Sequence, residues 1–270
     1  MAKKTVTEIT MQNSLDATLQ KVLDILEAED EKSFEEKKEI AIQLLKEQDN
    51  SPLAETLVNH ALADQEGKRI SADFWESGKI LSASSNVFLR KVDESDKEDY
   101  LNLQRRYAVI KSMLSKKAYL DMIWNEYIDD KALYSSIIRA GKYIGYCGIK
   151  NTTKKPWEIA IEIFPEWTNQ GIGTLSITAM LNEIKSRLGI TEYRIRIEPS
   201  NYISQRMFEK IGATPNGISK LWIHDQDTIF KCEEDNLQQI DEHLIKVAEK
   251  FNVTPRKLLS HVLEYTLSWK

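Results

Sequence analysis

The apolar residues in the first quarter of the chain recur at helical spacing. Between residues 14 and 66 they return every three or four positions, which places them on one face of a helix. Ser33 and Glu36 form a capping box that opens one helix. Pro52 suits the first turn of the next, because that position needs no backbone donor. The pattern predicts an all-helical accessory region over residues 1–80.

After Gly78 the pattern changes to short apolar runs with a period of two, which is typical of strands. Strands are expected at residues 86–92, 133–139, 142–150, 157–164 and 192–198, followed by a hairpin at 221–232. Helices are expected at residues 96–106, 118–127, 172–188 and 202–211. This order predicts one domain of the α/β (α+β) class with a mixed sheet, spanning residues 86–233.

Helical spacing returns over residues 236–268, where Thr254 is placed to cap a last helix with Pro255 in its first turn. This predicts a C-terminal helical pair over residues 234–270. The apolar stripes of both helical flanks must be buried against something. Three uses are open: an accessory domain packed on the sheet domain, a homodimer interface, or a surface that binds a protein substrate or regulator.

Composition and charge narrow the class of protein. Hydrophobic residues make up 41% and charged residues 29% of the 270, which is an ordinary globular balance. The formal net charge of −5 argues against a nucleic-acid partner, although the C-terminal spacing could also suit a DNA-reading helix pair. No run approaches the roughly 18 apolar residues of a membrane span. The first residues lack the apolar segment of a signal peptide, so a cytoplasmic protein without a membrane partner is expected.

Few other side chains suggest chemistry by themselves. No metal is expected, because the histidines are scattered and no His, Cys or carboxylate spacing matches a metal site. Cys147 and Cys232 lie in apolar runs and are expected to be reduced. Several aromatic residues could line an acceptor pocket or simply belong to the core: Tyr100, Tyr107, Tyr119, Trp124 and Tyr127.

A glycine-containing loop, T-N-Q-G-I-G-T at residues 168–174, lies between an expected strand and an expected helix. Its glycines let the backbone approach a ligand, and the free amides and dipole of a helix N-terminus favour a pyrophosphate. No G-K-[ST] follows, which excludes a nucleotide-hydrolysing P-loop. Ser176 stands at the last glycine position of a dinucleotide fingerprint. A cofactor that carries phosphate but is not split at phosphorus remains, with an ordinary glycine turn as the alternative.

Residues 168–173 resemble the cofactor-binding motif of the GNAT superfamily of N-acetyltransferases. That motif reads Arg or Gln, two residues, Gly, one residue, and Gly or Ala. Gly171 and Gly173 match it, whereas Thr168 stands where the family usually has Arg or Gln.

A second block, EPSNYISQRMFEKIGA at residues 198–213, also resembles the family. Asn201 and Ser204 reproduce an N-x-x-S form that looks like the branch acetylating ribosomal-protein N-termini. The resemblance covers about residues 87–232. It implies a GNAT-like, mostly antiparallel sheet flanked by helices, acetyl-CoA as acyl donor, and an amine as acceptor.

The resemblance also suggests roles for side chains. Many members carry a tyrosine acid where this chain has Phe208, so protonation of the leaving group is assigned to Ser204, with a capping or solvent-facing serine as the alternative. Glu158 and Glu162 are four apart on one strand and share a face. Either could deprotonate the attacking amine, with Glu158 matching a glutamate of that branch, or both could lie on a solvated sheet face.

In the resembled fold, the strand expected at residues 157–164 parts from its neighbour, and its backbone groups bind the cofactor. The cofactor-binding residues are therefore predicted to be Ile163, Phe164, Asn169, Gln170, Gly171, Ile172, Gly173, Thr174 and Asn201.

The leading functional hypothesis is direct transfer of an acetyl group from acetyl-CoA to a primary amine of a protein or peptide. A small-molecule amine is the second choice of acceptor. Phe208 and Thr168 favour a different alternative, a non-catalytic module that binds acyl-CoA and acts through its helical flanks.

Overall fold

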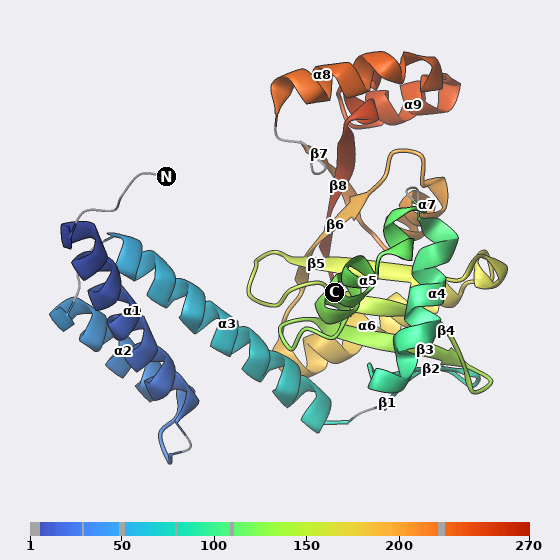
Figure 1. Ribbon diagram of the computed structural model, residues 1–270. Coiled ribbons are helices and arrows are strands. Elements are labelled where there is room, and N and C mark those ends of the chain that lie inside the picture. The colour runs from blue at the N-terminus through green and yellow to red at the C-terminus, as the bar shows by residue number, and fades with distance from the viewer. Residues whose placement is uncertain (1–5, 29, 49–51, 79, 109–110, 221–224) are drawn as a thin grey trace. The chain divides into compact units, whose positions relative to one another are not determined.

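The computed structural model describes residues 6–28, 30–48, 52–78, 80–108, 111–220 and 225–270 (Figure 1). The chain divides into two compact units, residues 1–69 and 70–270. Each unit is described by itself. The three-part division drawn from the sequence stays a prediction.

The first unit is helical, which confirms the pattern found in the sequence. It contains α1 (Val6–Glu27), α2 (Phe34–Gln48) and most of α3 (Pro52–Glu76). The predicted capping box forms: the Ser33 amide donates to Glu36 Oε2 at 2.7 Å, and the Glu36 amide donates to Ser33 Oγ at 3.3 Å. The helices bury a small core of their own, made of Val22, Leu26, Ala41, Leu45, Ala54, Val58 and Leu62.

The second unit is built on an eight-stranded sheet with the order β1-β2-β3-β4-β5-β6-β8-β7. Its strands are β1 (Ile80–Ser84), β2 (Val87–Lys91), β3 (Leu133–Arg139), β4 (Lys142–Ile149), β5 (Trp157–Ile163), β6 (Glu192–Ile197), β7 (Thr214–Lys220) and β8 (His261–Ser268). All neighbouring strands are antiparallel except β5 and β6, which are parallel. The mixed, mostly antiparallel sheet expected from the sequence is confirmed.

Helices cover both faces of this sheet (Figure 1). One face carries α4 (Lys97–Tyr107) and α5 (Lys117–Tyr127), and the other carries α6 (Ile172–Leu188). The remaining helices of this unit are α7 (Tyr202–Lys210), α8 (Gln226–Asp235) and α9 (Glu242–Lys250), and the last two lie beyond the end of the sheet (Figure 1). The period of two along β3 separates the faces. Leu133 and Ile137 pack in the core that contains α6, whereas Tyr134 packs in the aromatic cluster of α4 and α5.

The predictions for the C-terminal part need two corrections. The predicted hairpin at 221–232 is wrong over its described part. Residues 221–224 lie outside the described residues, and α8 begins at Gln226, capped by Asp225, whose side chain accepts from the Thr228 amide at 2.8 Å. The predicted last helix is also wrong: Pro255–Leu259 forms a short 3₁₀ turn, and the chain then enters β8.

Strand β8 forms because its apolar residues also alternate, and the sheet offers a place for them. Leu263, Tyr265 and Leu267 are fully or almost fully buried, at 0, 0 and 1% exposure. β8 lies between β6 and β7 and pairs with both. The apolar spacing of this segment also fits a helix, but pairing with β6 and β7 and burial in the core favour the strand.

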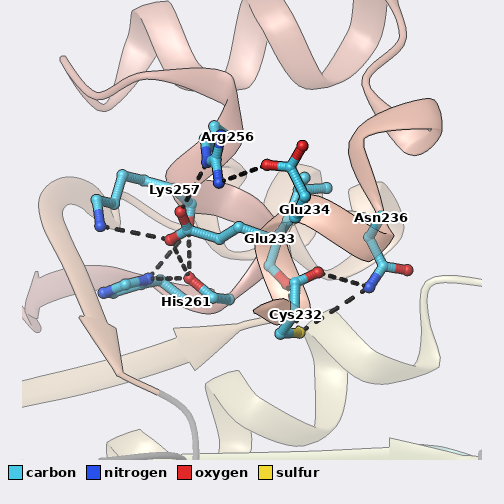
Figure 2. Close-up of polar contacts among 9 residues, drawn as sticks. Cys232, Glu233, Glu234, Asn236, Arg256, Lys257 and His261 are labelled. Atoms are coloured by element: carbon cyan, nitrogen blue, oxygen red, sulfur yellow. Dashed lines mark hydrogen bonds and ion pairs between the residues drawn. The ribbon is translucent and has the colours of Figure 1, made fainter. Parts of the chain in front are cut away.

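A buried carboxylate holds the segment inserted between β7 and β8 (Figure 2). Glu233 on α8 is 3% exposed and accepts from Ser260 Oγ at 2.7 Å and from Arg256 Nε at 3.1 Å. Lys257 Nζ adds a contact at 3.4 Å. Ser260 Oγ also lies 2.8 Å from Nδ1 of His261, the first residue of β8. Helix α8 is thus anchored to the start of β8, the last strand but one in the sheet.

Because β8 lies between two other strands and is buried, a substitution that removes one of its apolar side chains should destabilise the protein. Leu263→Ala should lower the free energy of unfolding by about 2–5 kcal/mol, because it leaves a cavity in a fully buried site. Urea denaturation checks this, with Leu237→Ala as the control, since Leu237 is 37% exposed. Equal, small effects of the two substitutions would contradict the burial of β8.

Candidate active site

The candidate site opens where two neighbouring strands part. β5 pairs with β6 only from Trp157 to Ile159, opposite Tyr193 to Ile195. β5 continues to Ile163 without that partner, while β6 stays paired with β8 along its whole length. The second half of β5 therefore presents a free backbone edge toward the gap.

A cavity of about 870 Å³ lies along this gap. It is lined by β5, the following loop, the first turn of α6, the end of β6, and α7, with Tyr107 from α4. The lining residues are Tyr107, Ile161, Glu162, Ile163, Trp167, Thr168, Asn169, Gly171, Gly173, Thr174, Glu198, Ser200, Asn201, Ile203, Ser204, Arg206, Met207 and Lys210. Both sequence blocks therefore contribute to one cavity.

The backbone groups of β5 alternate between its two neighbours. The Phe164 amide donates to the Ile144 carbonyl at 3.0 Å, and the Glu158 carbonyl accepts from the Lys150 amide at 3.0 Å. Even-numbered residues thus bond to the β4 side, and Ile163 directs its backbone groups to the gap. The amide of Phe164 is already used and Phe164 does not line the cavity, so this geometry gives no support to its predicted cofactor contact.

The loop before α6 gives this helix an open N-terminus. Gly171 caps α6 with a φ of 75°, a left-handed conformation that favours glycine, and a Cβ there would meet nothing within 4 Å. The amides of the first helical turn, residues 172–174, have no carbonyl acceptor within a helix. They carry the positive end of the helix dipole toward the cavity, which suits a phosphate-bearing ligand.

Gly173 serves a different purpose, because it permits the close approach of two helices. A Cβ at Gly173 would lie 2.8 Å from Sδ of Met207 on α7. A side chain at this position would therefore require the Met207 side chain to move.

Two carboxylates line the cavity, Glu162 on β5 and Glu198 just after β6, and burial raises the pKa of both. Glu162 is the one of the two that was predicted from the sequence. Its Oε2 accepts from Nε2 of Gln104 on α4 at 2.6 Å. Burial raises the pKa of Glu162, and hydrogen bonds from Gln104 and Tyr146 only partly oppose this. A carboxyl with a raised pKa is closer to the working range of a general base near neutral pH.

Glu158 lies on the same strand but outside the cavity, in a cage of cations. Its Oε2 accepts from Arg194 Nη2 at 3.0 Å and from Arg196 Nε at 2.9 Å, and its Oε1 accepts from Lys150 Nζ. Burial acts to raise the pKa of Glu158, but the charges and hydrogen bonds of Lys150 and Arg196 outweigh it, so the pKa is lowered. Such a carboxylate is a weak base, and this geometry does not support the catalytic role predicted for Glu158.

Ser204 lies in the first turn of α7 and lines the cavity. Asn201, not Ser204, caps this helix: Asn201 Oδ1 accepts from the Ser204 amide at 3.1 Å. Phe208, where a tyrosine acid would stand, is 2% exposed and belongs to the core. The hydroxyl of Ser204 lies at the cavity, where it is available for the predicted proton transfer, and Lys210 of the same helix also lines the cavity.

Of the other predicted cofactor residues, some line the cavity and some do not. Asn169, with a φ of 58°, lines the cavity together with Gly171, Gly173 and Thr174. Ile172 is buried in the core and can offer only its amide. The Gln170 side chain is turned away, because it donates to the Glu166 carbonyl at 2.9 Å and accepts from Arg139 at 2.7 Å.

Several cavity residues were not assigned from the sequence. Tyr107, left open between pocket and core, lines the cavity, and its hydroxyl donates to the Ile163 carbonyl at 2.6 Å. Gln104, which contacts Glu162 but does not itself line the cavity, was also missed, although its spacing of three from Tyr107 places both on one face of α4. Arg206 and Lys210 were also missed; they share a face of α7 at a spacing of four and add positive charge to the lining.

Residues 86–214 match the family model of the acetyltransferase (GNAT) domain. The fold, the parted strands and the helix-capping glycine loop agree with this match, so the chain contains an acetyltransferase domain of the GNAT class, which uses acetyl-CoA as acyl donor.

Several solved structures are similar to this chain at low identity. RimL, the ribosomal L7/L12 alpha-N-protein acetyltransferase, in complex with coenzyme A is 14% identical with a TM-score of 0.50, covering 70% of this chain and 98% of that one. The microcin C7 self-immunity acetyltransferase MccE with acetyl-CoA and AMP is 15% identical, with a TM-score of 0.48 and coverage of 69% and 94%. Mycobacterium smegmatis RimJ with CoA-disulfide is 13% identical, with a TM-score of 0.47 and coverage of 71% and 86%.

No curated protein is significantly similar to the chain in sequence. Within the described residues, no helix is long and apolar enough to cross a membrane. The same part of the chain contains no group of three or more His, Cys, Asp or Glu side chains that could hold a metal ion.

The cation cage around Glu158 predicts a pH-dependent stability. Glu158→Gln should lower the free energy of unfolding at pH 7 by about 1–3 kcal/mol, a range discounted because the cations are partly exposed. Because the folded pKa is lowered, this stabilisation is present above the unfolded pKa of about 4.3 and is lost as the pH falls through the folded pKa.

Urea denaturation at pH 7 and near pH 3 checks this, with the exposed Glu98→Gln as control. The gap between wild type and Glu158→Gln should shrink at the lower pH. A gap that is constant with pH would show that Glu158 does not act as a paired carboxylate.

Proposed function

We propose that this protein transfers the acetyl group of acetyl-CoA to a primary amine of a protein or peptide by direct attack. The observation that carries the proposal is the cavity between β5 and β6, where a free strand edge, an open helix N-terminus and the Glu162 carboxylate converge. An acyl donor with a phosphate-bearing arm and an amine acceptor both find suitable groups there.

The donor is held mainly by the backbone in this proposal. The amides of residues 172–174 bind the diphosphate, and the gap-facing amide of Ile163, whose carbonyl already accepts from Tyr107, binds the pantetheine arm or polarises the thioester carbonyl. Asn169 and Asn201 line the same cavity and complete the predicted cradle. When bound, acetyl-CoA supplies an acyl carbon activated by its thioester.

In this proposal Glu162 and Ser204 carry out the two proton transfers of the reaction. The acceptor ammonium first loses one proton to solvent, and Glu162, held by Gln104, then takes a second proton from the attacking amine, directly or through water. The nitrogen–carbon bond then forms as the carbon–sulfur bond breaks, and the Ser204 hydroxyl gives a proton to the departing sulfur. Glu162 ends protonated and returns its proton to solvent, from which Ser204 is restored, so the charges balance.

A protein or peptide amine is the acceptor we would test first. The RimL structure, named for acetylation of a ribosomal protein N-terminus, shares the fold at 14% identity, which makes such an acceptor a starting point. A small-molecule amine is the second choice. A non-catalytic role is favoured by two sequence features, Phe208 in place of a tyrosine acid and Thr168 in place of the usual Arg or Gln.

The direct test is release of coenzyme A thiol from acetyl-CoA in the presence of peptides with free N-termini, lysine peptides and small amines. Thiol release above the acceptor-free rate with peptides supports the proposal. Release with small amines alone would show that the acceptor is a small-molecule amine and not a peptide. Saturable acetyl-CoA binding without release from any acceptor would favour the binding module.

The raised pKa of Glu162 predicts how activity depends on pH. Wild-type kcat/KM should fall as the pH falls through this pKa, because the carboxyl then holds its proton and cannot accept another. Glu162→Gln should lower kcat by about 10²–10⁴-fold and remove that acidic limb from the profile.

Glu158→Gln is the matched control, since Glu158 lies on the same strand outside the cavity. Its profile should keep the acidic limb. An unchanged limb in Glu162→Gln, or a loss of the limb in Glu158→Gln alone, would assign the base elsewhere.

A further inference from the structure

The loop that offers its amides to the cofactor carries no positive side chain of its own. Between Phe164 and Thr174 the one charged residue is Glu166. Thr168 is neutral, and its hydroxyl bonds back to the Pro165 carbonyl at 2.8 Å. A diphosphate bound there would contact the helix amides but would be repelled by the Glu166 carboxylate. The net charge of the loop is therefore unfavourable for binding an anion.

Two arginines from outside the loop correct this charge. Arg106 on α4 places Nη2 at 3.2 Å from Glu166 Oε2 and offsets that carboxylate. Arg139, the last residue of β3, donates from Nη1 to Gln170 Oε1 at 2.7 Å. Its guanidinium carbon also lies 4.9 Å from the centre of the Trp167 ring, within range of a cation–π contact.

Arg139 thereby holds both sides of the loop. Trp167 stands before Thr168 and Asn169, and Gln170 stands after them, so one guanidinium bridges the turn. Gln170 also restrains the start of the loop, because its Nε2 donates to the Glu166 carbonyl at 2.9 Å. The bridged backbone includes a left-handed residue, since Asn169 has a φ of 58°. This conformation is unfavourable for a residue other than glycine and persists when surrounding contacts hold it.

The bridge lies directly behind the wall of the cavity. Trp167, Thr168, Asn169 and Gly171 line the cavity, and Arg139 contacts the first of them. Charges interact over a screening length of about 10 Å at moderate salt, so a guanidinium that contacts a residue of the cavity wall can attract a diphosphate bound in the cavity.

We propose that Arg139 is the positioning residue of the cofactor loop. It holds residues 167–170 in the conformation that aims the α6 amides into the cavity, and it supplies the positive charge that the loop lacks. An arginine suits this task because its planar group can stack on an indole and donate a directed hydrogen bond at the same time. The inference rests on the proposed acetyl-CoA site.

Arg139→Gln tests the inference by calorimetric titration with coenzyme A and by kinetics with acetyl-pantetheine, a donor without the diphosphate. The expected result is an affinity for coenzyme A about tenfold weaker at low salt, a smaller difference at high salt, and an unchanged kcat/KM for acetyl-pantetheine. Arg105→Gln is the charge-matched control, because Arg105 is exposed and bonds to Asn102 within α4.

Arg139→Lys keeps the charge but loses the planar group, so its affinity for coenzyme A should lie between wild type and Arg139→Gln; it also serves if Arg139→Gln does not fold. Equal coenzyme A affinity of wild type and both variants would overturn the inference while leaving the proposed function intact. An equal loss with coenzyme A and acetyl-pantetheine would also overturn it, as a general effect on folding. Absence of binding by the wild type would instead contradict the proposed function.

Discussion

The parting of β5 from β6 is the constraint on which the rest of the site depends. At the paired end, Glu158 on β5 accepts from Arg194 and Arg196 on β6 and so locks the two strands together. Beyond Ile159 the pairing stops, and β6 remains held by β8 on its other side. The edge of β5 is then left free near Glu162 and Ile163, where the cavity lies. One strand thus carries a structural carboxylate and a candidate catalytic one, four residues apart.

Local pattern was enough to predict the features that depend on neighbouring residues. The capping box predicted at Ser33 uses atoms three residues apart and is present in the structure, and the predicted glycine loop does precede α6, which Gly171 caps. The two sequence blocks could be assigned to one site because a strand and a helix have fixed places between them. Neither inference required knowledge of distant contacts.

Distant contacts decided what the sequence could not predict. Glu158 and Glu162 share a face of β5, but the partners that separate their roles lie far along the chain: Gln104 is 58 residues from Glu162, and Arg196 is 38 residues from Glu158. β8 is likewise a strand because β6 and β7 accept it, although its apolar spacing also fits a helix. The segment between β7 and β8 adds further support for the site, since His243 on α9 packs against Tyr202 on α7 with ring centres 3.5 Å apart.

The central claim is that the open N-terminus of α6 receives the phosphates of acetyl-CoA. Calorimetric titration of acetyl-CoA into wild type, Gly171→Glu and Gly189→Glu tests it most directly. Gly189 is the matched control, because it ends the same helix with a similar φ of 69° and open space around it, but at the opposite end. The account predicts saturable binding by wild type and Gly189→Glu and loss of binding by Gly171→Glu, where bulk and negative charge enter the cavity. Undiminished binding by Gly171→Glu, or none by the wild type, would contradict it.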